Sequence, residues 1–288
     1  MNDYNLLQLS DIYRNEVAPL RRWVTKVGTD VLTTGSGNGI NERTIEGIVG
    51  QLHSLQEAKK EVALVTSGAI GYGDRIRGVK TDLYDTVGRQ VSASVGQPRL
   101  MATYNRAFDN RHMILGEVQL TFDRLSNPEK LVHYRNAMEG MFKERIVPVI
   151  NENDVVDPKE LEAHSYEANG NGEKSQTTFS DNDELAAMAA YAIGAQALII
   201  LSIEEGLMDY SRNRKISVIE DIQDAHQYVR RGKSSGGLGG MESKLRAISY
   251  AMDRGIHVIL ASGLKRNVVP LIFGAEPLGT YFRPRPFA

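Results

Sequence analysis

The sequence predicts an α/β protein built on a mainly parallel β-sheet with helices on both faces. Short runs rich in Val, Ile and Leu recur along the chain, and longer amphipathic stretches separate most of them. Strands that alternate with helices of this length are typical of parallel sheets. The runs that we expect to form strands are Trp23–Val27, Val62–Thr66, Met113–Leu120, Ile146–Ile150, Ala197–Ser202 and Ile256–Ala261.

The amphipathic stretches predict the helices. Apolar side chains at helical spacing in residues 1–20 predict an N-terminal helical extension, packed on the body or on a partner subunit, before a main domain of residues 21–288. Residues 157–178 lack an apolar period, and loops of that length are usually functional or disordered. The expected helices are Glu42–Lys59, Thr86–Asp109, Pro128–Glu144, Asp183–Ile193 and Met241–Arg254.

Composition indicates an ordinary globular protein. The 288 residues suit one large α/β domain or two modest ones, and 41% of them are hydrophobic and 24% charged. The 34 basic and 36 acidic side chains give a net charge of −2, which favours neither nucleic acid nor an anionic membrane as a partner. Cysteine is absent, so disulfides, thiolate catalysis and Cys-ligated zinc are excluded.

Targeting signals are not recognisable. No apolar stretch approaches the roughly 20 residues that a membrane helix needs. Residues Met1–Arg14 lack the basic-then-apolar order of a signal peptide. We therefore expect a cytoplasmic protein that binds neither membrane nor nucleic acid.

Three segments resemble phosphate-binding loops in part. Residues 232–234 match the end of a Walker A motif, but Gln227 stands where its first glycine belongs. Residues 35–39 begin like a dinucleotide fingerprint, but Ile40 replaces the third glycine, so a plain turn is the better interpretation. Residues 236–244 fit better, because glycines let a backbone wrap closely around phosphates at the start of a helix. A flexible linker before a helix fits this last segment equally well.

Polar segments at three places predict one binding site. Val65–Gly71, Asn151–Asp154 and Asp181–Asp183 each adjoin an apolar run and together hold glycines, amides and carboxylates. That mixture suits a small zwitterion with an ammonium and carboxylates. Lys26 and Lys244, both in glycine-rich surroundings, add the cations that a triphosphate needs. The residues therefore favour a kinase that acts on an amino-acid carboxylate.

Strand ends predict where that site lies. In parallel sheets ligands bind beyond the carboxyl ends of the strands. This rule places Gly28, Ser67, Asn151 and Ser202 at one edge of the sheet.

With these segments in this order, the chain resembles the amino acid kinase family from about residue 22 to residue 283. Asn-Glu-Asn-Asp after a Val-Pro-Val-Ile strand, with Asp-Asn-Asp downstream, resembles the branch of the family that phosphorylates glutamate. The motifs that carry the resemblance are Val24–Thr29, Val65–Ile70, Val95–Gln97, Val147–Asp154, Asp181–Asp183, Gly239–Met241 with Lys244, and Gly279–Thr280.

The resemblance implies a three-layer αβα sandwich and ATP with Mg²⁺ as cofactors. It also implies phosphorylation of the L-glutamate γ-carboxylate to γ-glutamyl phosphate, the first step of proline biosynthesis. Because that carboxylate has a reference pKa of about 4.3 and is already ionised at neutral pH, the reaction needs no general base. We therefore expect none of the 6 histidines to be catalytic. The site must instead stabilise charge and align two anions that repel each other.

The resemblance implies roles for individual residues and assigns no dedicated metal ligand. Lys26 and Lys244 would stabilise the transferring phosphoryl group from opposite sides, and Asp183 would hold both lysines. The substrate would be bound by backbone N–H groups of Ser67, Gly68 and Ala69 and by the side-chain amides of Asn151 and Asn182. The carboxylate of Asp154 would bind the α-ammonium group of the substrate. The ATP-binding residues would be Lys26, Gly28, Ser202, Ile203, Gly239, Gly240, Met241 and Lys244. Without the resemblance, Asn151 and Asp154 fit equally well as residues that terminate a strand.

Some positions depart from the family pattern. Ile203 and Met208 stand where an aspartate and a tyrosine are usual, which predicts shifted adenine contacts or weaker nucleotide binding. Asp30 stands where Ser or Ala is usual, and it could pair with a lysine or help to hold magnesium. Many bacterial members append an RNA-binding-type domain, and we expect none after Ala288.

Two other functions stay open. One is a degenerate kinase that acts as an amino-acid sensor or scaffold, and the other is a kinase of another small acidic amino acid. Ile203 and Asp30 are the support for a sensor, whereas the presence of both lysines with Asp154 and Asp183 opposes it. Besides L-glutamate and ATP, the expected partners are proline as a feedback inhibitor and further copies of the chain in a dimer or tetramer.

Overall fold

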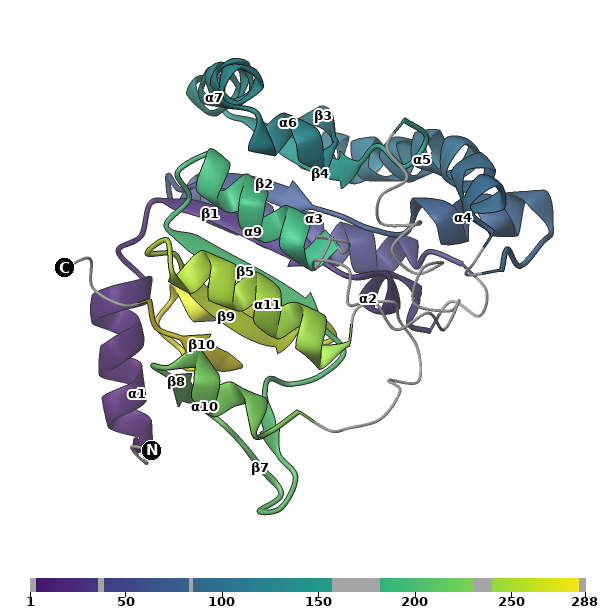
Figure 1. The fold of residues 1–288 in the computed structure, drawn as a ribbon. Helices are drawn as coiled ribbons and strands as arrows, with labels where there is room; N and C mark the ends of the chain where they lie inside the picture. Colours follow the sequence, from purple (N-terminus) through teal and green to yellow (C-terminus); the bar gives the residue numbers. More distant parts are fainter. Residues whose placement is uncertain (1–3, 36–38, 83–84, 157–181, 230–239, 285–288) are drawn as a thin grey trace.

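The structure is a computed structural model that describes residues 4–35, 39–82, 85–156, 182–229 and 240–284. An 8-stranded sheet lies between two layers of helices (Figure 1). The strand order is β3-β4-β2-β1-β5-β9-β10-β8, and every pairing in this sheet is parallel except that of β10 with β9. The predicted mainly parallel sheet in a three-layer αβα arrangement is therefore confirmed. The strands are β1 Arg22–Val27, β2 Glu61–Val65, β3 Ile114–Leu120, β4 Ile146–Glu152, β5 Ala197–Ser202, β8 Val218–Ile219, β9 His257–Ser262 and β10 Thr280–Phe282.

Each face of the sheet carries its own apolar core. Successive residues of a strand point to opposite faces, so Ala63 and Val65 of β2 belong to one core and Leu64 to the other. The core with Val65 is covered by α6 Phe122–Ser126, α7 Pro128–Lys143, α9 Asn182–Ala192, α10 Ile222–His226 and α11 Met241–Met252. The opposite core is covered by α1 Leu6–Ile12 with the π-helical turn Tyr13–Val17, α2 Thr29–Thr33, α3 Glu42–Glu57, α5 Thr86–Asp109 and α12 Val268–Phe273.

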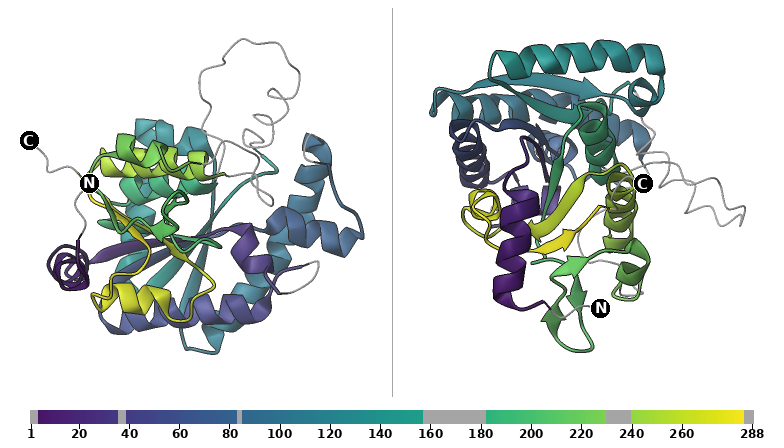
Figure 2. Two further views of the ribbon diagram at one scale, coloured as in Figure 1. Left: turned by 90° about the horizontal axis from the view of Figure 1, so that it is seen from below. Right: turned by 90° about the vertical axis from the view of Figure 1, so that its left-hand side faces the viewer.

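The N-terminal helix packs on the body of the same chain. Leu9, Tyr13 and Val17 are buried, and the Tyr13 hydroxyl donates a hydrogen bond to the carbonyl oxygen of Leu278. Figure 2 shows this helix beside the C-terminal part of the sheet. Just before β8 in the chain, β6 Met208–Asp209 and β7 Arg214–Lys215 form a separate small hairpin.

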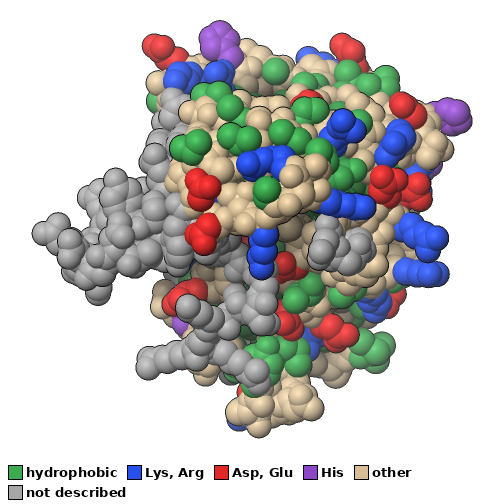
Figure 3. Space-filling view, turned by 90° about the vertical axis from the view of Figure 1, so that its right-hand side faces the viewer, with side chains coloured by type: hydrophobic (Ala, Val, Ile, Leu, Met, Phe, Trp, Pro, Cys, Tyr) green, Lys and Arg blue, Asp and Glu red, His purple; other side chains and the backbone are tan. Residues whose placement is uncertain are grey.

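Helices α4 (Ala69–Arg77) and α5 form an arm that protrudes from the body (Figure 2). Their backbones touch: a Cβ atom on Gly73 would lie 1.8 Å from the carbonyl oxygen of Ser92, and one on Gly96 would lie 1.8 Å from that of Ala69. Apolar side chains remain exposed on this side of the molecule (Figure 3), and Val87 is 68% exposed. This close packing against α5 holds the first turn of α4 in position.

Candidate active site

The carboxyl ends of four neighbouring parallel strands define the site. Residues opposite one another in the sheet are Lys26 and Val65 in the β1–β2 pair, Val65 and Ile150 in the β2–β4 pair, and Val27 and Leu201 in the β1–β5 pair. The residues that follow these positions therefore share one edge of the sheet. They are Gly28, Ser67, Asn151 and Ser202, as the strand-end rule predicts.

A buried carboxylate joins two lysines at this edge. The Nζ atom of Lys26, near the end of β1, lies 2.6 Å from Oδ1 of Asp183. The Nζ atom of Lys244, in the first turn of α11, lies 3.1 Å from Oδ2 of the same residue. Asp183 itself lies in the first turn of α9 and is 0% exposed. Three elements that are far apart in sequence thus bring their charged groups to one point.

The electrostatics of this Lys26–Asp183–Lys244 cluster favour an anionic ligand. Burial alone would raise the pKa of Asp183, but the charges of the two lysines hold the pKa below its ordinary value. The carboxylate is therefore ionised at neutral pH. Two ammonium groups contact this one carboxylate, and ammonium groups are natural partners for a phosphate.

Small residues surround the two lysines. Gly28 is the N-cap of α2, and a Cβ atom there would lie 3.6 Å from Nζ of Lys26. Gly240 is the N-cap of α11, and its carbonyl oxygen accepts the backbone N–H of Lys244 at 3.3 Å. Met241 begins α11, and Gly239 lies outside the described residues. The backbone of a ligand-binding loop can thus approach both ammonium groups closely.

Ser202 and Ile203 follow β5 at the same edge. The Ser202 side chain accepts the backbone N–H of Glu204 at 3.2 Å, which fixes the turn after the strand. Ile203 is 47% exposed, and its carbonyl oxygen accepts a hydrogen bond from the Ser262 hydroxyl. An exposed apolar side chain is thus present where the family pattern has an aspartate.

The segment after β2 is shaped by one glycine. Gly68 has φ +101°, and a Cβ atom there would lie 2.9 Å from Cδ1 of Ile40, so the position requires glycine. Helix α4 starts directly afterwards at Ala69, while Ser67 is buried. The first N–H groups of a helix have no partner within the helix, so this turn offers donors to a carboxylate.

Polar side chains from β4 and α9 complete the edge. Asn151 is 2% exposed and Asp154 is 8% exposed. Gln90 of α5 donates to the carbonyl oxygens of Asp154 and Val155, at 3.2 and 3.0 Å. The Oδ1 atom of Asn182, next to Asp183, is buried and has no hydrogen-bond partner among the described residues. A ligand with donor groups would satisfy that oxygen.

Asp30 lies in the first turn of α2. Within the described part of the chain it forms no ion pair with Lys26, whose carboxylate partner at 2.6 Å is Asp183. Met208, the other position that departs from the family pattern, is half-buried at the start of β6.

Comparison with known proteins identifies the family. The model of the amino acid kinase family matches residues 21–262. The chain belongs to the amino acid kinase family. It is similar to the glutamate 5-kinase of Nitrosomonas eutropha, with 33% identity over 93% of this chain and 69% of that protein. It is also similar to the glutamate 5-kinase of Lactiplantibacillus plantarum, with 34% identity over 91% of this chain and 96% of that protein.

Two solved structures share the fold. A UMP kinase from Bacillus anthracis aligns with a TM-score of 0.59 and 14% identity, over 93% of this chain and 97% of that one. An N-acetylglutamate synthase from Neisseria gonorrhoeae aligns with a TM-score of 0.62 and 13% identity, over 99% of this chain and 65% of that one. At such low identity the likeness concerns the fold alone.

Two glutamines of α5 contribute to this edge of the sheet. Gln97 belongs to one of the motifs that carry the resemblance, whereas Gln90 was not predicted, although residues seven apart lie on the same face of a helix. Both glutamines reach the β4 segment, through Asn151 and through the Asp154 carbonyl oxygen. The available signal was a pair of amides at helical spacing on a helix that is otherwise packed against the sheet.

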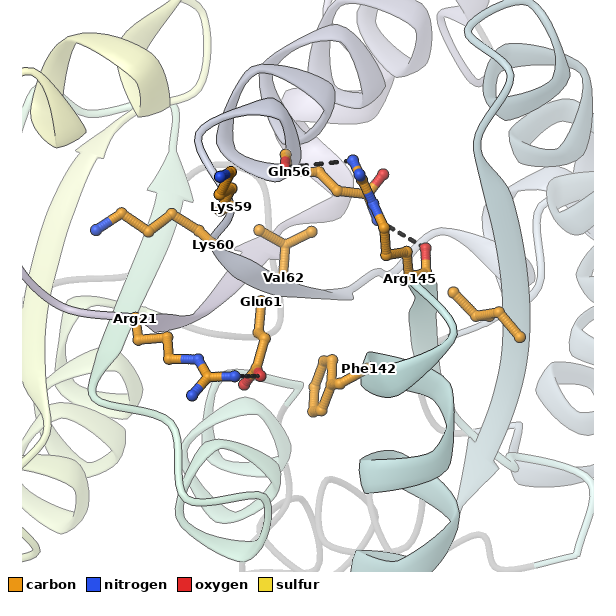
Figure 4. Close-up of a pocket in the computed structure, with 9 residues that line it drawn as sticks. Arg21, Gln56, Lys59, Lys60, Glu61, Val62, Phe142 and Arg145 are labelled. Atoms are coloured by element: carbon orange, nitrogen blue, oxygen red, sulfur yellow. Dashed lines mark hydrogen bonds and ion pairs between the residues drawn. The ribbon is translucent and has the colours of Figure 1, made fainter.

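A pocket lies at the opposite edge of the sheet from the candidate site (Figure 4), near the amino ends of β1, β2 and β4. Three of its four basic side chains are engaged by other described residues, the exception being Lys59: Arg21 pairs with Glu61 at 2.6 Å, and Arg145 pairs with Glu57 at 3.2 Å. Lys60 donates to two backbone carbonyl oxygens at 2.8 and 2.7 Å. These contacts join the segment before β1 to β2 and the turn before β4 to α3, so the pocket has a structural explanation. Its lining residues are Arg21, Gln56, Lys59, Lys60, Glu61, Val62, Phe142, Arg145 and Ile146.

Within the described ranges, no helix combines the length and the hydropathy that spanning a membrane requires.

Proposed function

We propose that this amino acid kinase transfers the γ-phosphoryl group of ATP to the γ-carboxylate of L-glutamate and forms γ-glutamyl phosphate, the first step of proline biosynthesis. The observation that carries the proposal is the Lys26–Asp183–Lys244 cluster at the carboxyl edge of the sheet. The similarity to proteins named glutamate 5-kinase, at 33% and 34% identity, supports the choice of substrate.

The two lysines supply charge stabilisation. The acceptor carboxylate and the triphosphate are both anions, so the main barrier is to bring them together in line. Lys26 and Lys244 approach from different elements, and negative charge that develops on the transferring group would be shared between them. Asp183 acts by positioning, because each of its oxygens holds one ammonium group.

Glutamate recognition would use the β2 and β4 segments. Backbone N–H groups of Ser67, Gly68 and Ala69 suit a substrate carboxylate, because they lie at the start of α4. Asp154 would bind the α-ammonium group through a charge-assisted hydrogen bond. Asn151 and Asn182 would add amide contacts.

ATP would bind beside the lysines with Mg²⁺. The ATP-binding residues that we propose are Gly28, Ser202, Ile203, Gly239, Gly240 and Met241 with both lysines. Magnesium in kinase sites is held largely by phosphate oxygens and water with one or two carboxylates. The residues fit this mode, because Asp30 lies in the turn after Gly28 and forms no ion pair among the described residues. When bound, the metal would neutralise charge on the phosphates.

The test is ATP-dependent formation of γ-glutamyl hydroxamate, compared for glutamate, aspartate and N-acetylglutamate. We expect product with glutamate and much less with the other two acids. Product with aspartate or N-acetylglutamate instead would reassign the substrate, and no product from any of the three would favour a sensor or scaffold. Feedback inhibition by proline, assembly into a dimer or tetramer and a cytoplasmic location belong to the same proposal.

A further inference from the structure

A chain of side-chain hydrogen bonds runs from the edge strand to the candidate active site. Glu117 of β3 accepts a hydrogen bond from Nε2 of Gln97 at 2.8 Å. Oε1 of Gln97 in turn accepts one from Nδ2 of Asn151 at 2.8 Å. Gln97 and Asn151 are buried, at 9% and 2% exposure, whereas Glu117 is exposed. We call this arrangement the Glu117–Gln97–Asn151 relay.

The relay has a fixed polarity because one end of it can only accept. An ionised carboxylate offers lone pairs and no protons. Gln97 must therefore turn its NH₂ group toward Glu117 and its carbonyl oxygen toward Asn151. Asn151 must then present its own NH₂ group to Gln97. The orientation of both amides thus follows from hydrogen-bond chemistry.

One consequence concerns the other side of the Asn151 amide. With Nδ2 engaged by Gln97, the carbonyl oxygen Oδ1 is left on the opposite side of the group. Asn151 lies beside the segment that leads to Ser67, because the backbone N–H of Thr66 donates to the carbonyl oxygen of Ile150. At this edge the site therefore presents an acceptor from Asn151 in addition to the carboxylate of Asp154.

We propose that Glu117 is a positioning residue that acts through Gln97 to hold the Asn151 carbonyl oxygen toward the substrate, where it accepts a hydrogen bond from a free α-ammonium group. This inference rests on the proposed function and deepens it. An N-acylated amino acid has only one N–H and no positive charge, so two acceptors disfavour it. The relay therefore contributes to the discrimination between glutamate and N-acetylglutamate.

Reversal of the relay provides the test. Glu117→Lys replaces an acceptor by a donor, so Gln97 must turn around and present its NH₂ group to Asn151. Asn151 would then present its own NH₂ group to the substrate. Asn151→Asp alone places a carboxylate against the Gln97 carbonyl oxygen. The double variant restores a complete donor–acceptor chain of opposite polarity, and it still offers an acceptor to the substrate.

Two measurements report on the relay. For each single variant we expect a lower thermal unfolding midpoint. For Glu117→Lys, which turns the Asn151 NH₂ group toward the substrate, we also expect a glutamate KM raised about tenfold or more, with kcat and the KM for ATP little changed. In the double variant both quantities should return most of the way to the wild-type values. Additive losses in the double variant would overturn the proposal, since two independent structural defects do not correct each other.

Matched controls separate charge from polarity. Glu46→Lys makes the same change of charge at an exposed position of α3 whose side chain forms no hydrogen bond or ion pair within the described ranges, and it should leave both quantities unchanged. Glu117→Gln keeps an acceptor at this position and should retain most of the glutamate affinity. Loss of affinity in Glu117→Gln as large as that in Glu117→Lys would overturn the role of relay polarity.

The unfolding midpoint keeps this test distinct from that of the proposed function. If the wild-type protein formed no γ-glutamyl hydroxamate, the proposed function would fail. The four midpoints would still decide the relay: mutual rescue in the double variant would support its polarity, and additive loss would refute it.

Discussion

The Nζ atom of Lys26 lies 2.6 Å from the carboxylate of Asp183, at a point where the lysine side chain is 5% exposed and the aspartate 0% exposed. Burying such a pair is costly unless further interactions offset the loss of hydration. Lys244 provides one by contacting the second carboxylate oxygen. Both oxygens of Asp183 thus hold an ammonium group in place, which is the arrangement expected of groups that must stabilise charge without reorganising.

Loss of either lysine should affect the chemical step more than binding. For Lys26→Met and Lys244→Met we expect kcat to fall about 100-fold or more, because the transferring group loses a cation that matters most in the transition state. Steady-state kinetics with varied glutamate and ATP would measure this. Lys143→Met, at an exposed lysine in the last turn of α7, is the control. A rise in KM at unchanged kcat would contradict the role.

Asp183→Asn should destabilise the protein at neutral pH by about 3–5 kcal/mol, because two lysines lose the carboxylate that they contact in a buried site. In the wild-type protein the pKa of the Asp183 carboxyl group is lowered in the folded state. The stabilisation that this carboxylate provides is therefore present above the unfolded pKa of about 3.9, and it is lost as pH falls through the folded value. Urea unfolding of both proteins from pH 7 to pH 3 would measure the difference. A difference that stays constant down to pH 3 would show that the carboxylate charge is not its source.

Most strands and long helices of the fold were predictable, because each is marked by the spacing of apolar residues within its own segment. Ala197–Ser202 is predicted and observed with the same bounds as β5, and Thr86–Asp109 with those of α5. β10 was missed because its three residues form no apolar run and pair with β9 only in the folded sheet. Helix α4 was missed because Gly71 and Gly73 lower its helix propensity, and its contact with α5 compensates.

The site was predictable only in part. Strand ends predict which residues share an edge, because parallel strands end at the same side of a sheet. Strand ends do not predict that α9 and α11 lie side by side, which brings Lys244 to Asp183; the family resemblance alone implies that contact. The orientation of the Asn151 amide depends on Gln97 and Glu117 of two other elements, and no local pattern encodes it.

Gln90→Leu should weaken glutamate binding without changing the chemical step. The amide of Gln90 holds the turn that carries Asp154, and leucine removes both hydrogen bonds at similar volume. We expect the glutamate KM to rise about three- to tenfold, equivalent to one net hydrogen bond. Gln223→Leu, at an exposed position of α10, should leave KM unchanged. An unaltered glutamate KM in Gln90→Leu would show that the turn is held by other contacts.

Gly96→Ala should destabilise the α4–α5 arm. The new methyl group would overlap the Ala69 carbonyl oxygen, so the helices must separate, at a cost of about 1–3 kcal/mol. Because α4 begins beside Ser67, the glutamate KM should rise as well. Gly47→Ala is the matched control, since a Cβ atom there meets nothing within 4 Å, and it should stabilise α3 by up to about 1 kcal/mol. Equal unfolding free energies for the two variants, measured in urea, would refute the close contact.

His257 should make the stability depend on pH around its unfolded pKa. Its Nδ1 atom lies 2.6 Å from the Tyr281 hydroxyl, which donates to Glu16 of the N-terminal helix, so the neutral ring donates from Nδ1. Burial lowers the pKa of His257 in the folded state, although the Glu16 charge acts in the opposite direction. The unfolded chain then binds more protons between the folded pKa and about 6.5, so the free energy of unfolding rises with pH across this window and levels off above it. Thermal unfolding from pH 5 to pH 8 should show this slope in the wild-type protein and a weaker one in His257→Gln. An identical slope in the two proteins would assign the pH dependence to other groups.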